Sequence, residues 1–170
     1  MAKIINTYKQ SVPAMRFIGR NDPLKGRGWG DGATWTALGE IEKAAGGSEV
    51  INGFFEDAGA YIGFLHLDQD LKLLGYWIGI FVPADTQVPE GLDYFDFSPQ
   101  NFGVAWIQGK DMSDIGKQFG KVIEHLQAAG MEIVLQNDGS RFQFERYPCP
   151  RYTTPDENGN IICDYCFFVK

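Results

Sequence analysis

The chain has 170 residues, 44% of them hydrophobic and 14% aromatic, which is enough to bury the interior of one domain spanning residues 1–170. Acidic residues outnumber basic ones by 22 to 15, and the net charge of −7 argues against direct binding to nucleic acid. The N-terminus lacks the apolar run of a signal peptide, and no stretch approaches the roughly 20 apolar residues of a membrane span. We therefore expect a cytoplasmic protein without a membrane or DNA partner.

The first half of the chain predicts the order strand, helix, strand, strand. An alternating strand over 12–20 leads into a Gly-rich polar loop. Over 34–45, apolar residues recur at three- and four-residue intervals, which indicates an amphipathic helix that ends at two glycines. Two apolar runs at 61–67 and 73–82, joined by a short polar turn, are typical of a β-hairpin.

The second half repeats this order. A strand is predicted over 101–110, and an apolar stripe then indicates a helix with Ser113 as its N-cap and Gly130 at its end. Two further strands follow, over 141–147 and 161–169, separated by a polar loop.

Internal duplication explains the repeated order. The segment 73–81 aligns without a gap with 161–169, and this alignment sets Trp77 against Tyr165. The repeats cover about 1–83 and 98–170. Between them, the segment 84–97 reads as a linker, and Pro83 and Pro89 discourage regular pairing there.

The predicted fold is therefore α+β, with duplicated strand-helix-strand-strand repeats that form a pseudo-twofold antiparallel sheet. One helix covers each half-sheet and leaves the other face of that half free. We expect the free faces to meet and to enclose a central ligand cleft lined by alternate strand residues.

Glu145 is the first candidate site residue. It shares a strand face with Gln143 and Tyr147, while Phe142 and Phe144 point to the other face. If the phenylalanines fill the core beneath the second helix, Glu145 faces the cleft, where a carboxylate withdrawn from water attracts a cation or a hydrogen-bond donor. The alternative is a solvent-exposed glutamate cross-paired with a basic residue.

Aromatic side chains are the second signal, because flat rings supply apolar area, stacking and cation–π attraction. Each alone is more often a core residue than a site residue. Trp35 and Phe119 lie on apolar helix stripes and are assigned to the core. The loop at 26–32 lacks a nucleotide-binding fingerprint, so its tryptophan is interpreted as a flap over the cleft. The aromatic candidates for ligand binding are Trp29, Tyr61, Trp77, Tyr94 and Trp106.

The three cysteines do not suggest a disulfide framework, a metal site or a cofactor. Cys163 and Cys166 have the spacing of a metal or redox motif, but both lie in the predicted strand over 161–169. Positions three apart in a strand face opposite sides, so the two sulfurs cannot share one ion. We interpret both as buried thiols.

Four motifs together resemble the GyrI-like, or AraC-type effector-binding, domain family over nearly the whole chain. They are Tyr76–Pro83, Val88–Tyr94, Phe144–Tyr147 and Thr154–Lys170. The resemblance implies a duplicated fold with a central cleft and an acidic residue in the penultimate strand that meets hydrophobic cations in multidrug-sensing relatives. Only Glu145 carries over at the level of a residue. The aromatic wall carries over as a type of surface, with Trp77, Trp106 and Tyr147 as its expected members.

The first predicted strand starts within about a dozen residues of Met1, which leaves no room for a preceding three-helix DNA-binding module. The chain therefore resembles the stand-alone members of the family. The leading hypothesis is a sensor or sequestering protein for hydrophobic, planar compounds, including cationic ones, acting as a monomer or weak homodimer.

Two other functions remain open. The first is a metal-independent hydrolase of cyclopropanoid or other strained electrophiles, in which Glu145 activates water and Tyr147 polarises the leaving carbonyl. The second is an interaction module that inhibits a protein partner through its acidic surface.

Overall fold

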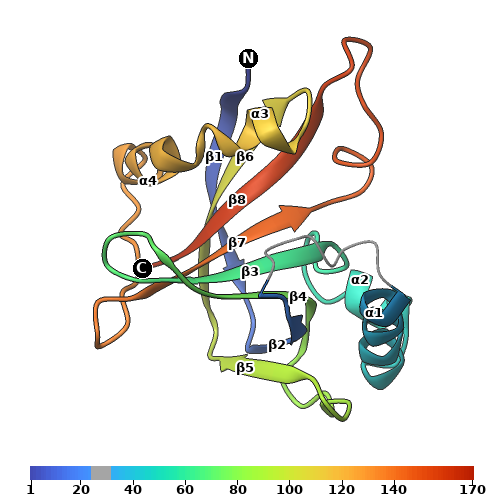
Figure 1. The fold of residues 1–170 in the computed structure, drawn as a ribbon. Coiled ribbons are helices and arrows are strands. Elements are labelled where there is room, and N and C mark those ends of the chain that lie inside the picture. Colours follow the sequence, from blue (N-terminus) through green and yellow to red (C-terminus); the bar gives the residue numbers. More distant parts are fainter. Residues whose placement is uncertain (24–31) are drawn as a thin grey trace.

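The computed structural model describes residues 1–23 and 32–170, and Figure 1 shows how its helices and strands follow one another. The first half contains β1 (Lys3–Val12), β2 (Met15–Asn21), α1 (Gly32–Ala44), α2 (Ser48–Asn52), β3 (Tyr61–Leu67) and β4 (Leu73–Pro83). The second half contains β5 (Asp93–Phe97), β6 (Gln100–Gly109), α3 (Met112–Gly116), α4 (Phe119–Ala128), β7 (Arg141–Tyr147) and β8 (Ile161–Val169).

Within the described residues, the strands form one eight-stranded antiparallel sheet in the order β1-β6-β8-β7-β3-β4-β2-β5. The six central strands lie in the order β6-β8-β7-β3-β4-β2. If β2 is exchanged with β6, β3 with β7 and β4 with β8, the result is the same order read in the opposite direction. This is the arrangement of an approximate twofold axis that passes between β3 and β7. The predicted α+β class and the duplicated pseudo-twofold sheet are confirmed.

The two outermost strands are not predicted by the sequence pattern. β1 pairs with β6, and β5 pairs with β2, so each half of the sheet gains one edge strand. β5 lies at the end of the segment 84–97 that reads as a linker. Pro83 and Pro89 both precede β5, so they leave its pairing with β2 undisturbed.

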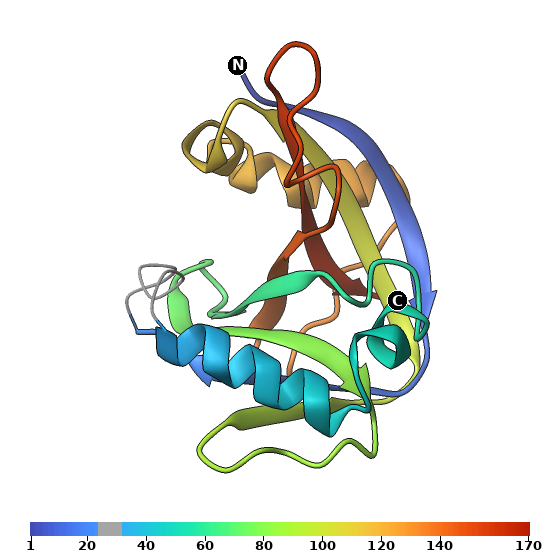
Figure 2. The same cartoon turned by 90° about the vertical axis from the view of Figure 1, so that its right-hand side faces the viewer.

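The helices cover the two ends of one face of the sheet. In Figure 2, α1 lies below and α3 and α4 lie above, with the central strands between them. Ile18, Leu38 and Ile41 pack together in the core under α1 and α2, and Ile107, Val122 and Leu126 do so under α3 and α4. The sequence predicts the cleft on the opposite face, which is free of helices, and this placement is wrong.

The opposite face is filled by phenylalanine rings. Phe81 of β4 and Phe102 of β6 lie 5.5 Å apart between ring centroids, although three strands separate β4 from β6 in the sheet. A flat sheet would hold them at about 19 Å, at roughly 4.8 Å for each strand step. The sheet is therefore strongly coiled, and it closes around a cluster that also contains Phe64 and Phe144.

The second helical segment is broken into α3 and α4. Its N-cap is Asp111, whose side chain accepts a 2.8 Å hydrogen bond from the backbone N–H of Asp114, so the prediction of Ser113 as the cap is wrong. Gly130 has a φ of 79° directly after the helix, as its predicted role as a terminator requires. No helix in the described part of the chain is both long and apolar enough to cross a membrane.

Cys163 and Cys166 lie on opposite faces of β8, as predicted. Cys163 packs in the core beneath α3 and α4, and Cys166 packs in the phenylalanine cluster. Both are fully buried free thiols. Burial raises the pKa of each thiol, so neither ionises readily.

Candidate functional site

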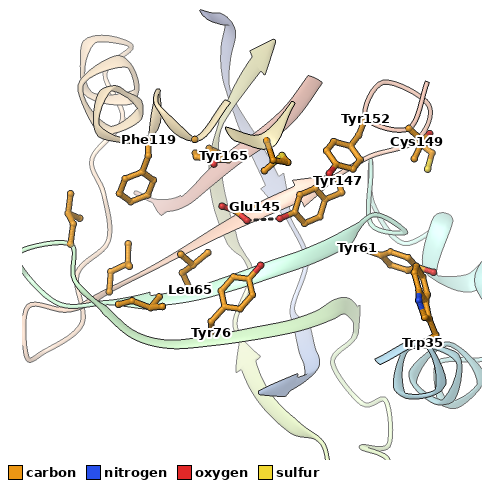
Figure 3. A pocket seen from close by; sticks show the side chains of 16 residues that line it. Trp35, Tyr61, Leu65, Tyr76, Phe119, Glu145, Tyr147, Cys149, Tyr152 and Tyr165 are labelled. Atoms are coloured by element: carbon orange, nitrogen blue, oxygen red, sulfur yellow. Dashed lines mark hydrogen bonds between the residues drawn. The ribbon is translucent and has the colours of Figure 1, made fainter. Parts of the chain in front are cut away.

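The candidate site is a cavity of about 740 Å³ between the two helical segments, above the central strands β3 and β7; we call it the central cavity. The pairing of the strands determines which residues form its floor. Glu145 of β7 pairs with Gly63 of β3 on one side and with Tyr165 of β8 on the other. One step further along the chain on this face, Tyr147 pairs with Tyr61. Figure 3 shows these side chains from close by.

Tyrosine hydroxyls surround the Glu145 carboxylate. Tyr147 donates a hydrogen bond of 2.5 Å to Oε2, which Figure 3 draws as a dashed line, and Tyr165, the cross-strand neighbour of Glu145 on β8, interacts electrostatically with the same carboxylate. The hydroxyl of Tyr76 reaches over Gly63, where Oε2 of Glu145 also lies. Burial and the negative charge of Glu145 together raise the pKa of Tyr147 and of Tyr165. Both hydroxyls therefore stay protonated as hydrogen-bond donors.

Apolar side chains build the rest of the wall. On one side, the rings of Trp35 and Tyr61 meet edge to face with centroids 5.7 Å apart. On the other, Phe119 at the start of α4 contacts the ring of Tyr165, with centroids 6.2 Å apart. Leu65 forms part of the floor between them. Among the described residues that line the cavity, Glu145 is the only charged one.

The loop between β7 and β8 contributes another wall through Tyr152, and Arg151 anchors this loop from behind. The Arg151 guanidinium makes hydrogen bonds of 2.7 Å to Asp57 and to the fully buried Asp164, and it lies 4.5 Å from the ring centroid of Trp106. Asp57 belongs to the first half of the chain and Asp164 to the second. The loop is therefore held by an ionic bridge between the two halves.

The structure brings together three of the predicted site residues, because Glu145, Tyr147 and Tyr61 all line the central cavity. The sequence-based placement of Glu145 in the cleft assumes that Phe142 and Phe144 fill the core beneath the second helix, and this assumption is wrong. Phe144 fills the phenylalanine cluster on the opposite face, not a core beneath the second helix, and Phe142 packs against that cluster. The alternation of the strand still directs Glu145 into the cavity.

Trp77, Trp106 and Tyr94 lie away from the central cavity, so their expected place in its wall is corrected. Trp77 packs on the opposite face against Phe95 and donates a 2.7 Å hydrogen bond to Asp93. Trp106 also lies on that face, beneath the guanidinium of Arg151. Tyr94 is exposed on β5 beneath the guanidinium of Arg16. Trp29 lies outside the described residues.

Sequence reasoning missed most of the aromatic wall. The pseudo-twofold axis exchanges β3 with β7 and β4 with β8. Leu65 of β3 pairs with Tyr76 of β4, and Glu145 of β7 pairs with Tyr165 of β8 in the same way, so Tyr76 is the counterpart of Tyr165. The ungapped alignment of the sequence instead matches Trp77 with Tyr165, one residue away from Tyr76. A shift of one residue turns a strand side chain to the other face of the sheet. Trp35 and Phe119 are predicted to be core residues, but each lies at the edge of the apolar stripe of its helix and lines the cavity.

A metal centre has no support in the described ranges 1–23 and 32–170, where no three His, Cys, Asp or Glu side chains are grouped to hold an ion. The chemistry on view is that of an apolar, aromatic hollow with one carboxylate and several phenol donors at its floor. Such a hollow can stack planar groups and place a positive charge or a donor against the carboxylate.

No family model matches the sequence, and no curated protein matches it. Two solved structures are similar along nearly their whole length. One is a candidate bacterial transcription regulation protein from Staphylococcus aureus MU50, with 16% identity, a TM-score of 0.55, and coverage of 98% of this chain and 99% of that one. The other is SAV2435 bound to tetraphenylphosphonium, with 15% identity, a TM-score of 0.58, and coverage of 98% and 94%.

The chain shares the fold of these proteins. At such low identity, the likeness extends to the fold and not to individual site residues.

Proposed function

We propose that this chain is a GyrI-like effector-binding domain that binds hydrophobic aromatic cations in its central cavity, as a sensor or a sequestering protein. The observation that carries the proposal is the position of Glu145. Its carboxylate is the one charged group among the described residues of an otherwise apolar and aromatic cavity. The bound tetraphenylphosphonium of SAV2435, a protein of the same fold, supports the choice of ligand class.

The size and chemistry of the cavity fit this class. A volume of about 740 Å³ lies within the range of roughly 300–1,000 Å³ that drug-sized ligands occupy. The rings of Trp35, Tyr61 and Phe119 offer faces and edges to the aromatic groups of a ligand. A delocalised cation loses little hydration on entering such a cavity, so its attraction to Glu145 is largely retained.

Calorimetry with tetraphenylphosphonium tests the proposal. We expect Glu145→Gln to weaken binding by about tenfold or more, because the substitution removes the charge and keeps the shape of the side chain. The neutral compound triphenylphosphine oxide should bind both proteins alike. Glu124→Gln, at an exposed position on α4 outside the cavity, is the matched control and should bind as the wild type does. Equal binding of the cation by Glu145→Gln would remove the carboxylate from its role.

The fate of a bound compound distinguishes binding from hydrolysis. After incubation with a cyclopropane-bearing electrophile, mass spectrometry should recover the compound unchanged if the protein only holds it. Gain of one water by the compound, abolished in Glu145→Gln, would instead establish the hydrolase.

A further inference from the structure

A second cavity of about 470 Å³ adjoins the central cavity; we call it the side cavity. The two cavities share Tyr61, Tyr147 and Cys149 in their linings, so a ligand in the central cavity has a neighbouring space at its end. The side cavity differs in chemistry. Its lining includes Glu42 at the end of α1 and Asn52 at the end of α2, which are hydrogen-bonding groups and not rings.

The charge in the side cavity comes from Glu42. The other carboxylate in its lining, Asp57, is paired with Arg151 at 2.7 Å and lies 3.7 Å from Arg146. Those two arginines also pair with Asp164, so this cluster of two arginines and two aspartates is neutral as a whole.

Glu42 is half-buried and makes no hydrogen bond or ion pair with any residue that the structure describes. It lies in the last turn of α1, where the negative end of the helix dipole adds to its charge. Lys43 is next in sequence but is exposed and stands outside the lining. Among the residues that the structure describes, no positive charge balances Glu42, so the side cavity carries a net negative charge beside a cavity suited to aromatic cations.

We propose that the side cavity is a subsite for an ammonium arm, so that the protein prefers elongated amphiphilic amines whose aromatic core occupies the central cavity. This inference rests on the proposed function. The core would lie over Glu145, and the arm would pass between Tyr61 and Tyr147 to bring its ammonium to Glu42. Asn52 offers the ammonium a carbonyl oxygen as an acceptor.

The test compares triphenylphosphonium ions that carry alkyl arms of increasing length, from propyl to octyl, with the same ions bearing a terminal amine. At the arm length that spans the two cavities, the amine should strengthen binding by about two- to tenfold, the range for a partly exposed ion pair near a helix end. Glu42→Gln should remove this gain and leave the plain alkyl ions unaffected. Glu40→Gln, an exposed charge change on the same helix outside both cavities, should retain the gain.

The outcomes separate the two proposals. If the plain ions bind in a Glu145-dependent manner but the amine adds nothing at any arm length, the subsite is refuted and the proposed function stands. The subsite is also refuted if the gain survives in Glu42→Gln. If no phosphonium ion binds, the proposed function fails and the subsite fails with it. Circular dichroism and thermal unfolding of each variant establish that the fold is retained.

Discussion

Gly63 lies directly opposite Glu145 in the pairing of β3 with β7, and its missing side chain leaves the space in which the hydroxyl of Tyr76 approaches the carboxylate. A Cβ at position 63 would lie 2.3 Å from the Tyr76 oxygen and 3.2 Å from Oε2 of Glu145. The group of phenols around the carboxylate therefore depends on glycine at this position.

Gly63→Ala should displace Tyr76 and weaken tetraphenylphosphonium binding. We also expect the free energy of unfolding to fall by about 1–3 kcal/mol, because an added methyl overpacks the site. Denaturant unfolding and calorimetry measure the two effects. Gly120→Ala is the control: it is exposed on α4 with no atom in the way of a new Cβ, and it should raise stability by up to about 1 kcal/mol. A Gly63→Ala protein that binds like the wild type would contradict the crowding argument.

Stability should decrease in alkaline solution because of the buried phenols. The pKa of Tyr147 is raised in the folded protein, so between the unfolded value of about 10 and the folded value the unfolded chain binds fewer protons than the native one. The free energy of unfolding then falls as pH rises through this window, by at most about 1.4 kcal/mol per pH unit for each such group. Urea unfolding at successive pH values should show a shallower fall for Tyr147→Phe. An equally steep fall would mean that Tyr147 titrates alike in both states.

Arg151→Met should destabilise the protein by about 2–3 kcal/mol, because it leaves the fully buried Asp164 with Arg146 as its only remaining arginine partner. Ligand affinity should fall as well, since Arg151 holds the loop that carries Tyr152. The control is Arg16→Met, which breaks an exposed pair with Asp96 and should cost no more than about 1 kcal/mol. Chemical denaturation compares the two, and similar losses would show that the bridge behaves like a surface pair.

Gln143→Met should stabilise the protein by about 1 kcal/mol. The Gln143 side chain is fully buried, and neither its oxygen nor its nitrogen has a hydrogen-bond partner among the described residues. Methionine has a similar volume and needs no partner.

Gln118→Met is the matched comparison, because Gln118 is also buried but donates a 2.9 Å hydrogen bond to the backbone oxygen of Ala2. That substitution should destabilise by about 1 kcal/mol. A loss of stability in Gln143→Met would indicate that its amide is satisfied in solution.

Three features follow from the amino-acid pattern alone: the repeated order of elements, the α+β class and the face of β7 on which Glu145 lies. These depend on local periodicity, since alternation in a strand and the apolar stripe of a helix are properties of neighbouring residues. The edge strands β1 and β5 were missed because their stability comes from pairing with β6 and β2, which are distant in the chain.

The face that holds the cavity and the rings that line it depend on how the sheet folds in three dimensions. The sheet coils around its phenylalanines, so the opposite face is filled and the cavity lies between the helices. Trp77 and Tyr76 are neighbours in the sequence, yet one packs among phenylalanines and the other reaches toward Glu145. A shift of one residue in the alignment of the two halves decides between them, because successive residues of a strand point to opposite faces of the sheet.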